Sequence, residues 1–273
     1  MYICKEILME QKRMKRILTC WLIVLLSFFR LSLSAQVDNS LSEYQLLRMD
    51  MAAANTFHSG ILLSMSCGND YMLKELMHAH ADALLIYDRH AFMLQLSHNG
   101  YSRYGELLTA FSYGVKFAGK FAAGLRFYYI YQHVAHYESR HSLCFDLSLY
   151  AKPAPKLAFG IEVYNPARLK YGITGKTLIP MRFTVAAVYK FSKKLLFSMK
   201  ILKFLPGLFD LSLSCYYQAV NFVNALLSLS LHEADFGLMF IYRRFLFTID
   251  MKYNYSLGFA PEVGFWVKLK TGR

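Results

Sequence analysis

Apolar and polar residues alternate with a period of two along much of this chain, most clearly over residues 235–254. In that stretch one face carries Phe, Leu, Tyr, Ile and Met, while Gly, Thr, Asp and Lys are gathered on the other, and the step Arg243-Arg244 separates two such runs. Alternation of this kind predicts a β-hairpin with one apolar face. Because that face is large and aromatic, the pattern is typical of a transmembrane β-barrel, in which lipid contacts the apolar residues and the lumen takes small and polar ones.

The same alternation recurs over residues 91–270 and predicts about twelve antiparallel strands, since a tilted strand crosses a bilayer with roughly 9–11 residues. Residues 60–66 and 83–87 would add one or two strands. Between them, Leu73, Leu76 and Met77 have helical spacing and predict a small helix. We therefore expect an all-β fold: a transmembrane antiparallel β-barrel of about 12–14 strands at residues 91–270, after an N-terminal arm at residues 36–90 with room for first strands and a small helix or plug.

The expected connections alternate in length. A barrel with tight periplasmic turns and longer outer loops has this asymmetry. The longer loops are expected at residues 133–141 and 165–180, and the short turns at residues 118–120, 152–156, 192–194 and 243–244.

A helical membrane protein is the alternative fold. Residues 211–231 form an uncharged run that is long enough to cross a membrane as a helix. The Leu-Ser repeats in this run keep a period of two, and Asn221 and Asn224 indicate a turn inside it. We therefore favour two strands.

Residues 1–35 have the three parts of a secretory signal peptide. A basic region at residues 12–16 precedes an apolar run at residues 17–29, and Leu33-Ser34-Ala35 provides a small-residue cleavage site. An uncleaved membrane anchor is the alternative. Together with the barrel pattern, the signal peptide predicts export to a bacterial outer membrane.

The charge balance is basic, with a formal net charge of +13 at pH 7. After residue 35 the positive residues are scattered singly, apart from the pairs Lys193-Lys194 and Arg243-Arg244, and there is no basic helix or recognisable nucleic-acid-binding module. We expect no nucleic-acid partner. Outer-membrane lipid is the expected neighbour, and anionic head groups or an anionic solute suit the charge.

Cysteine and histidine patterns predict neither a metal nor a cofactor. Cys67, Cys144 and Cys215 remain after export, an odd number at wide spacing with no CxxC pair. The loop at residues 133–141 carries three histidines, but their spacing lacks the cysteine or carboxylate partners of a zinc site.

An outer-membrane enzyme acting on lipid is an alternative function. It would need a nucleophile beside a histidine, held by a third group. Ser97-His98 and His232-Glu233 supply such residue types, as almost any chain with nine histidines does. We therefore expect that the protein is not an enzyme.

Charged residues on the polar faces of the strands form the candidate site. An Arg or Lys facing lipid near the bilayer midplane costs about 2–4 kcal/mol, so we expect these residues to face the lumen. There they would either pair across the barrel and close it or line a polar transport path. Pairing is favoured, because side chains and a plug can fill a narrow lumen. The set is Arg126, Asp146, Glu162, Arg182, Lys190, Lys200, Asp250, Lys252 and Lys268.

Three stretches resemble outer-membrane barrels of Bacteroidota-type bacteria: residues 32–36 (SLSAQ), residues 111–131 (FSYGVKFAGKFAAGLRFYYIY) and residues 158–172 (AFGIEVYNPARLKYG). The chain is most similar to the FadL-like class that includes PorV and PorQ of the type IX secretion apparatus. This resemblance implies an exported barrel that transports a solute or serves a secretion apparatus.

Two functions follow as expectations. The barrel provides passive transport of a small or hydrophobic solute, or it is a membrane-embedded component of a secretion or surface assembly with a protein partner; a structural barrel without transport is a further alternative. A channel should have an open lumen, whereas a scaffold should have a plugged lumen and apolar outer loops. The connection at residues 164–180 slightly favours the scaffold through Tyr164, Leu169, Tyr171, Ile173, Leu178 and Ile179.

Overall fold

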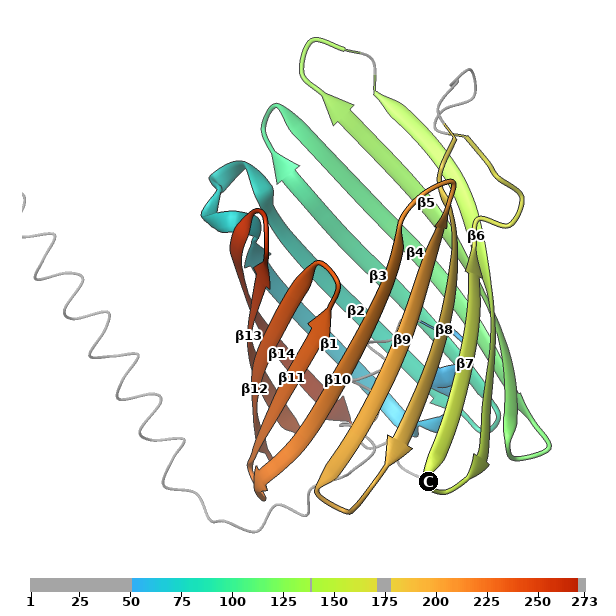
Figure 1. The fold of residues 1–273 in the computed structure, drawn as a ribbon. Helices are drawn as coiled ribbons and strands as arrows, with labels where there is room; N and C mark the ends of the chain where they lie inside the picture. Colours follow the sequence, from blue (N-terminus) through green and yellow to red (C-terminus); the bar gives the residue numbers. More distant parts are fainter. Residues whose placement is uncertain (1–50, 138, 171–177, 270–273) are drawn as a thin grey trace, which may run out of the picture. The chain divides into compact units, whose positions relative to one another are not determined.

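The computed structural model describes residues 51–137, 139–170 and 178–269, which form a closed antiparallel barrel of fourteen strands (Figure 1). Each strand pairs with the next along the chain, and β1 pairs with β14 to close the barrel. The expected fold and strand number are confirmed. The strands are β1 (Gly60–Asn69), β2 (Met77–Tyr87), β3 (His90–Tyr101), β4 (Tyr104–Phe117), β5 (Phe121–Val134), β6 (Arg140–Ala154), β7 (Leu157–Tyr164), β8 (Met181–Lys190), β9 (Leu195–Leu205), β10 (Phe209–Val220), β11 (Val223–Ser230), β12 (Glu233–Tyr242), β13 (Phe245–Asn254) and β14 (Gly258–Leu269).

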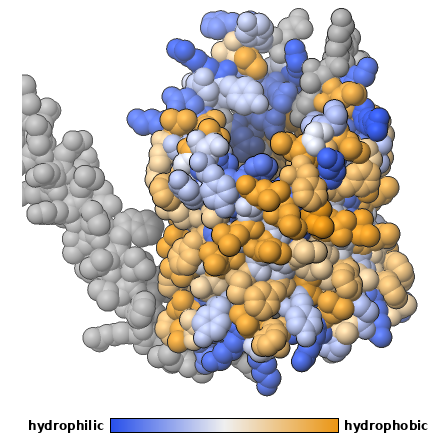
Figure 2. Space-filling view, in the orientation of Figure 1, coloured by the Kyte–Doolittle hydropathy of each residue, from blue (hydrophilic) through white to orange (hydrophobic). Residues whose placement is uncertain are grey.

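The outward faces of the strands are apolar and the inward faces are mixed. Phe127 on β5 is 55% exposed and Ile249 on β13 is 52% exposed, whereas their neighbours Arg126 and Thr248 are each 5% exposed. Exposed apolar residues form a band around the middle of the visible face of the barrel, with hydrophilic residues above and below it (Figure 2). This is the surface that lipid solvates in a membrane barrel.

The barrel begins earlier than the sequence pattern predicts, at Gly60, because β1 and β2 are full members of the sheet. The predicted small helix around Leu73 is wrong: only two single-turn 3-10 helices, η2 (Asp70–Met72) and η3 (Lys74–Leu76), lie between these strands. Small alanines occupy much of the lipid face of β2, while Leu84 and Ile86 are apolar on its lumen face, so the alternation is weak there. The helical spacing of Leu73, Leu76 and Met77 belongs to the short connection between β1 and β2 and to the first residue of β2.

The two ends of the barrel differ. At one end, here called the turn end, short connections join β2 to β3, β4 to β5, β6 to β7, β8 to β9, β10 to β11 and β12 to β13. The opposite, loop end carries the connection of residues 165–180 between β7 and β8 and also η2 and η3. This asymmetry agrees with the predicted alternation of connection lengths.

Residues 211–231, considered above as a membrane helix, form most of β10 and β11 instead. In the described part of the chain, no helix has the length and apolar character needed to cross a membrane. The signal peptide predicted at residues 1–35 and the beginning of the arm, up to residue 50, lie outside the described residues.

Side chains fill the lumen on its turn side. A buried apolar cluster gathers residues from many strands around the start of the described chain. A second cluster around Leu84 and Met93 lies beside it, with Trp266 packed against both. The first cluster is Met51, Ala53, Ala54, Ala122, Tyr150, Ala158, Ala186, Val188, Leu196, Tyr216, Leu226, Met239, Ile241 and Leu246.

Candidate functional site in the lumen

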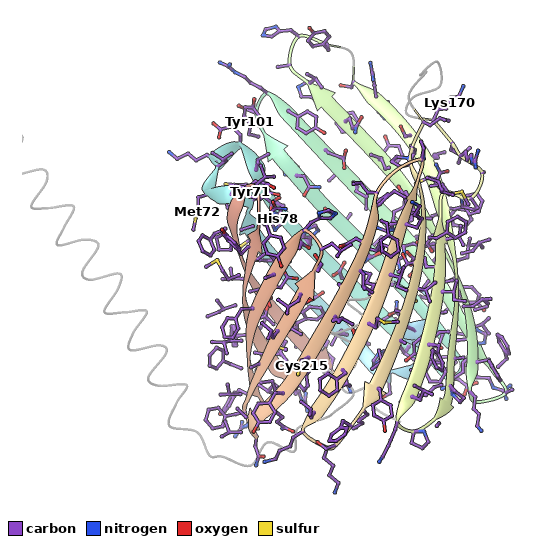
Figure 3. The ribbon with its side chains drawn as sticks, viewed as in Figure 1. Tyr71, Met72, His78, Tyr101, Lys170 and Cys215 are labelled. Atoms are coloured by element: carbon purple, nitrogen blue, oxygen red, sulfur yellow. The ribbon has the colours of Figure 1, made fainter. Side chains whose placement is uncertain are left out.

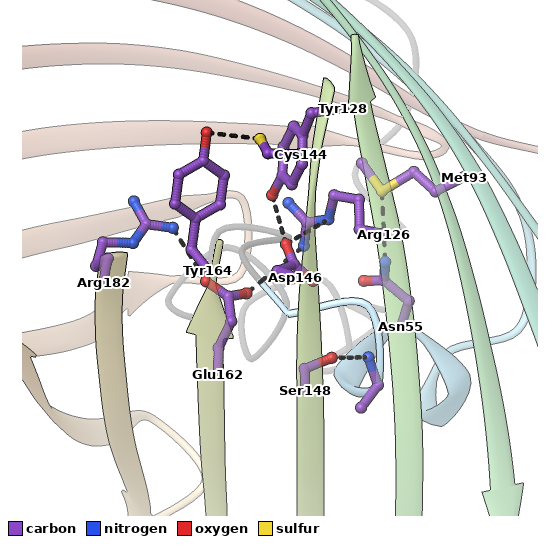
Figure 4. A network of polar contacts seen from close by, with 11 residues as sticks. Asn55, Met93, Arg126, Tyr128, Cys144, Asp146, Ser148, Glu162, Tyr164 and Arg182 are labelled. Carbon is purple, nitrogen blue, oxygen red and sulfur yellow. Dashed lines mark hydrogen bonds and ion pairs between the residues drawn. The ribbon is translucent and has the colours of Figure 1, made fainter. Parts of the chain in front are cut away.

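Four charged residues from four neighbouring strands meet on the inner wall of the barrel (Figure 4). Arg126 on β5 lies directly opposite Asp146 on β6, with Nε 3.5 Å from Oδ2. Glu162 on β7 contacts both arginines: Arg126 Nη2 lies 3.8 Å from its Oε2, and Arg182 Nη2 on β8 lies 3.0 Å from its Oε1. Both carboxylates are fully buried. The cluster therefore places two cations against two anions, with the two carboxylates screened from water.

Aromatic and sulfur groups complete this charged network. The Tyr128 hydroxyl donates a hydrogen bond to Asp146 Oδ2, and the Cys144 thiol donates one to the Tyr164 hydroxyl oxygen at 3.0 Å. The Arg182 guanidinium also lies 5.4 Å from the centre of the Tyr164 ring, within the range of a cation–π contact. These partners hold the charged side chains in fixed positions and supply hydrogen bonds that water would otherwise provide.

A plug, defined as residues 51–57, lies against the same wall. It ends in the 3-10 helix η1 (Ala54–Phe57), and residues 51–56 are buried. The Ala53 N–H donates to Ser148 Oγ at 3.1 Å, and Asn55 Nδ2 donates to the sulfur of Met93 at 3.3 Å. Ser148 lies one inward position from Asp146 on β6, so the plug and the charged network share a strand. Residues 51–57, which belong to the region predicted as an N-terminal arm at residues 36–90, therefore enter the lumen, whereas the possible plug was expected at the small helix around Leu73.

Glycines on the wall make room for the plug. A Cβ atom at Gly124 would lie 2.4 Å from Ala53 N, and one at Gly114 would lie 2.5 Å from Ala52 O. Gly114 and Gly124 are paired across β4 and β5, so they form one smooth patch under the plug backbone. Glycine is required here for close approach of two backbones. No side chain can replace it without moving the plug.

The loop side of the lumen is polar. Figure 2 shows a hollow there among hydrophilic side chains. His78, which Figure 3 labels, lies 3.6 Å from Asp70 and 4.0 Å from Glu262, and Lys252 lies 3.6 Å from the same glutamate. Among the described residues, no group of three or more His, Cys, Asp and Glu side chains is arranged to hold a metal ion.

The nine charged residues predicted as lumen-facing separate into three groups. Arg126, Asp146, Glu162 and Arg182 form the charged network. Lys200, Asp250 and Lys252 lie on inward positions of β9 and β13 farther round the barrel. Lys190 and Lys268 lie at the turn-end termini of β8 and β14, away from the network.

Sequence reasoning left several members of the site unassigned. Tyr128, Cys144 and Ser148 have the same inward alternation as Arg126 and Asp146, so strand parity could have identified them. Nothing in the pattern indicated that Asn55 would reach Met93, because that contact depends on where the plug enters the barrel. Tyr164 and Ile179, which were counted as outer-loop surface, instead pack inward around Cys144. Tyr171 and Ile173 lie outside the described residues.

The fold matches solved membrane channels. The toluene transporter TodX of Pseudomonas putida aligns with a TM-score of 0.64 at 8% identity, over 83% of this chain and 94% of that chain. The monoaromatic hydrocarbon channel CymD aligns with a TM-score of 0.60 at 9% identity, over 84% of this chain and 94% of that chain. A FadL homologue of Pseudomonas aeruginosa aligns with a TM-score of 0.56 at 8% identity, over 81% of this chain and 92% of that chain.

No protein-family model matches the chain, and no curated protein matches it. At such low identity the structural likeness establishes the fold alone. The FadL-like part of the sequence resemblance is supported at the level of fold, and TodX and CymD are described as a toluene transporter and a monoaromatic hydrocarbon channel.

Proposed function

We propose that this protein is a passive outer-membrane channel for a small, largely apolar solute, and that the plug at residues 51–57 gates it. The observation that carries this proposal is the way the plug is held. It is buried in the lumen among wall side chains, yet within the described chain only two hydrogen bonds, Ala53 to Ser148 and Asn55 to Met93, join it to the wall, beside a cation–π contact between Lys116 and Phe57. A methionine sulfur is a weak acceptor, so the second bond adds little.

Release of the plug costs few polar contacts. Among the described residues, the buried Asn55 Oδ1 has no hydrogen-bond partner, and a buried unpaired carbonyl gains free energy when water reaches it. The other plug hydrogen bonds, including Thr56 Oγ1 to Ala53 O, are internal and can move with the segment. This supports a plug that leaves as a unit.

The lining of the path supports an apolar solute. Between the charged network and the turn end, the lumen is lined by apolar side chains such as Leu196, Leu226 and Met239. Plug displacement would leave a passage of this character. The solved neighbours described as toluene and monoaromatic hydrocarbon channels have the same fold, which agrees with solutes of this class.

A disulfide that holds the plug closed tests the gate. Ala53→Cys and Ser148→Cys would be combined in a background with Cys67, Cys144 and Cys215 changed to Ser, and uptake of labelled toluene would be followed in intact Gram-negative cells. Oxidised protein should show no uptake above cells without the barrel, and a reductant should restore it. The single Ser148→Cys variant is the control, and its uptake should not respond to reductant.

Two results would contradict the proposal. Equal uptake by oxidised and reduced protein, with the disulfide confirmed by mass spectrometry, would show that the plug is not a gate. Uptake no greater than in cells without the barrel, before and after reduction, would show that the barrel does not transport the solute.

A membrane-embedded part of a secretion or surface assembly is the second candidate. It is favoured by apolar side chains at the loop end, where Met72, labelled in Figure 3, is exposed. Leu257 in the β13–β14 connection is exposed as well. A role close to PorV or PorQ would fall within this candidate. A photoreactive residue at Met72 should then crosslink to one protein in native membranes, and crosslinking to lipid alone would count against it.

A further inference from the structure

The turn end of the barrel is almost uniformly cationic. In the described chain, Asp88 is the single acidic residue in its turns and adjoining strand ends. Lys120, Lys156, Lys193 and Lys194 are exposed, as are both arginines of the β12–β13 turn. The cations are Arg89, Lys116, Lys120, Lys152, Lys156, Lys190, Lys193, Lys194, Arg243, Arg244 and Lys268.

The cations at the turn end belong to two groups. Lys116, Lys152, Lys190 and Lys268 occupy inward positions of β4, β6, β8 and β14, and the Lys116 ammonium lies 5.3 Å from the centre of the Phe57 ring of the plug. The cations of the turns themselves are exposed. These turn residues are here called the basic rim: Arg89, Lys120, Lys156, Lys193, Lys194, Arg243 and Arg244.

Aromatic residues indicate the depth of the basic rim in a membrane. Phe117 and Phe121 flank the Lys120 turn and are exposed, and Phe191, 61% exposed, lies beside Lys193. Aromatic side chains concentrate where the acyl chains of a bilayer meet the head groups. The cations lie just beyond these aromatics, which is where lipid phosphates lie.

We propose that the basic rim binds the phosphate head groups of anionic phospholipids in the leaflet at the turn end. The rim follows the edge of the apolar band over adjacent strands, which is the arrangement of lipids around a barrel. An acidic protein partner would need the charge gathered on one exposed face. Head-group binding would fix the height of the barrel in the membrane, whichever solute it carries.

Fluorescence quenching by brominated lipids tests this binding. A Phe191→Trp probe at the turn end would be compared with a Tyr255→Trp probe at the loop end, in vesicles of phosphatidylcholine mixed with phosphatidylglycerol, with either lipid brominated. At Phe191→Trp we expect brominated phosphatidylglycerol to be preferred over brominated phosphatidylcholine as a quencher by about five-fold in low salt. This preference should decline as salt screens the charges. At Tyr255→Trp we expect a preference near one.

Charge variants distinguish an effect of the basic rim from an effect of the protein's overall positive charge. Lys156→Gln, Lys193→Gln and Lys194→Gln together should bring the preference at Phe191→Trp close to one. The matched loop-end set, Lys74→Gln, Arg103→Gln and Lys203→Gln, removes the same charge and should leave the preference unchanged. Gel mobility before and after boiling would confirm that each variant is folded.

Three outcomes would overturn the proposal. One is equal quenching by the two lipids at Phe191→Trp. Another is the same loss of preference in both triple variants. The third is complete loss of preference on adding millimolar inorganic phosphate at constant ionic strength, which would show that the rim takes free phosphate rather than a lipid head group.

Discussion

Glu162 and Arg182 face each other from β7 and β8, and their Oε1 to Nη2 distance of 3.0 Å is the shortest charged contact of the lumen network. The glutamate is fully buried and also contacts Arg126. One carboxylate therefore contacts a guanidinium group on either side of it, and Asp146 supplies the second negative charge of the network. This connection joins the wall of β5 and β6 to that of β7 and β8 through side chains as well as through the sheet.

Glu162→Gln should be strongly destabilising. It leaves two arginines with one remaining buried carboxylate, and breaking a buried ion pair on one side costs about 3–5 kcal/mol. Urea unfolding in detergent, followed by gel mobility, measures the change. Asp88→Asn is the control, because that aspartate forms an exposed pair with Arg89 and its loss should cost under about 1 kcal/mol. Equal midpoints for the two variants would show that the buried network contributes no more than a surface pair.

Gly124→Ala should displace the plug and raise conductance in planar bilayers. Its added methyl would meet Ala53 N at 2.4 Å, and the facing atoms belong to backbone that cannot turn aside. Gly105→Ala is the matched control on β4, because its nearest neighbour would be His98 Nε2 at 3.7 Å, an ordinary contact. Identical conductance of both variants and the parent would mean that the plug does not limit ion flow.

Period-two alternation was enough to predict the barrel, because lipid demands an apolar residue at nearly every second position. Parity along β5 and β6 likewise placed Arg126 and Asp146 on the same side of the sheet before their contact was known. The alternation fails where the lumen is itself filled. Leu84 and Ile86 are apolar and inward, so β2 lost its period and its connection was interpreted as a helix.

The plug could not be predicted for a different reason. Its position depends on long-range contacts such as Ala53 with Ser148, which are 95 residues apart, and on glycines whose role is visible only when something lies above them. Gly114 and Gly124 belong to an aromatic-glycine pattern that any barrel hairpin can use. The sequence therefore predicted a segment before the barrel without showing that it enters the lumen.

Leu96→Arg and Ser97→Arg should differ in their effect on insertion. Leu96 is 43% exposed on the lipid face of β3, where an arginine near the midplane costs about 2–4 kcal/mol. Ser97 is the next residue and faces the polar part of the lumen opposite His80. Folding yield into vesicles should fall for the first variant only. Thr248 makes a poorer comparison with Ile249, because it is buried against Gly264 and has no room for arginine. Equal yields for Leu96→Arg and Ser97→Arg would contradict the assignment of faces on β3.

Asn165→Ala should loosen the connection between β7 and β8. Asn165 is buried with a φ of 51°, a conformation that alanine adopts poorly. Its Nδ2 donates to Leu169 O at 3.2 Å and to Ile179 O at 2.7 Å, while its Oδ1 accepts from Leu169 N at 2.9 Å. These bonds hold Ile179 inward beside Cys144. Limited trypsin digestion should therefore cut the variant faster at Arg168 or Lys170, and mass spectrometry identifies the cut.

Two further variants separate the causes of that effect. Asn165→Gly keeps the backbone conformation but removes the side-chain hydrogen bonds, so it should be cut at an intermediate rate. Asn254→Ala removes a similar turn bond, Asn254 Oδ1 to Ser256 N at 3.0 Å, from a different loop at the same end of the barrel. Cleavage at Arg168 should be unaffected by that change. If Asn254→Ala accelerates it equally, the loosening is general to the loop end and Asn165 is not the residue that holds Ile179 in the lumen.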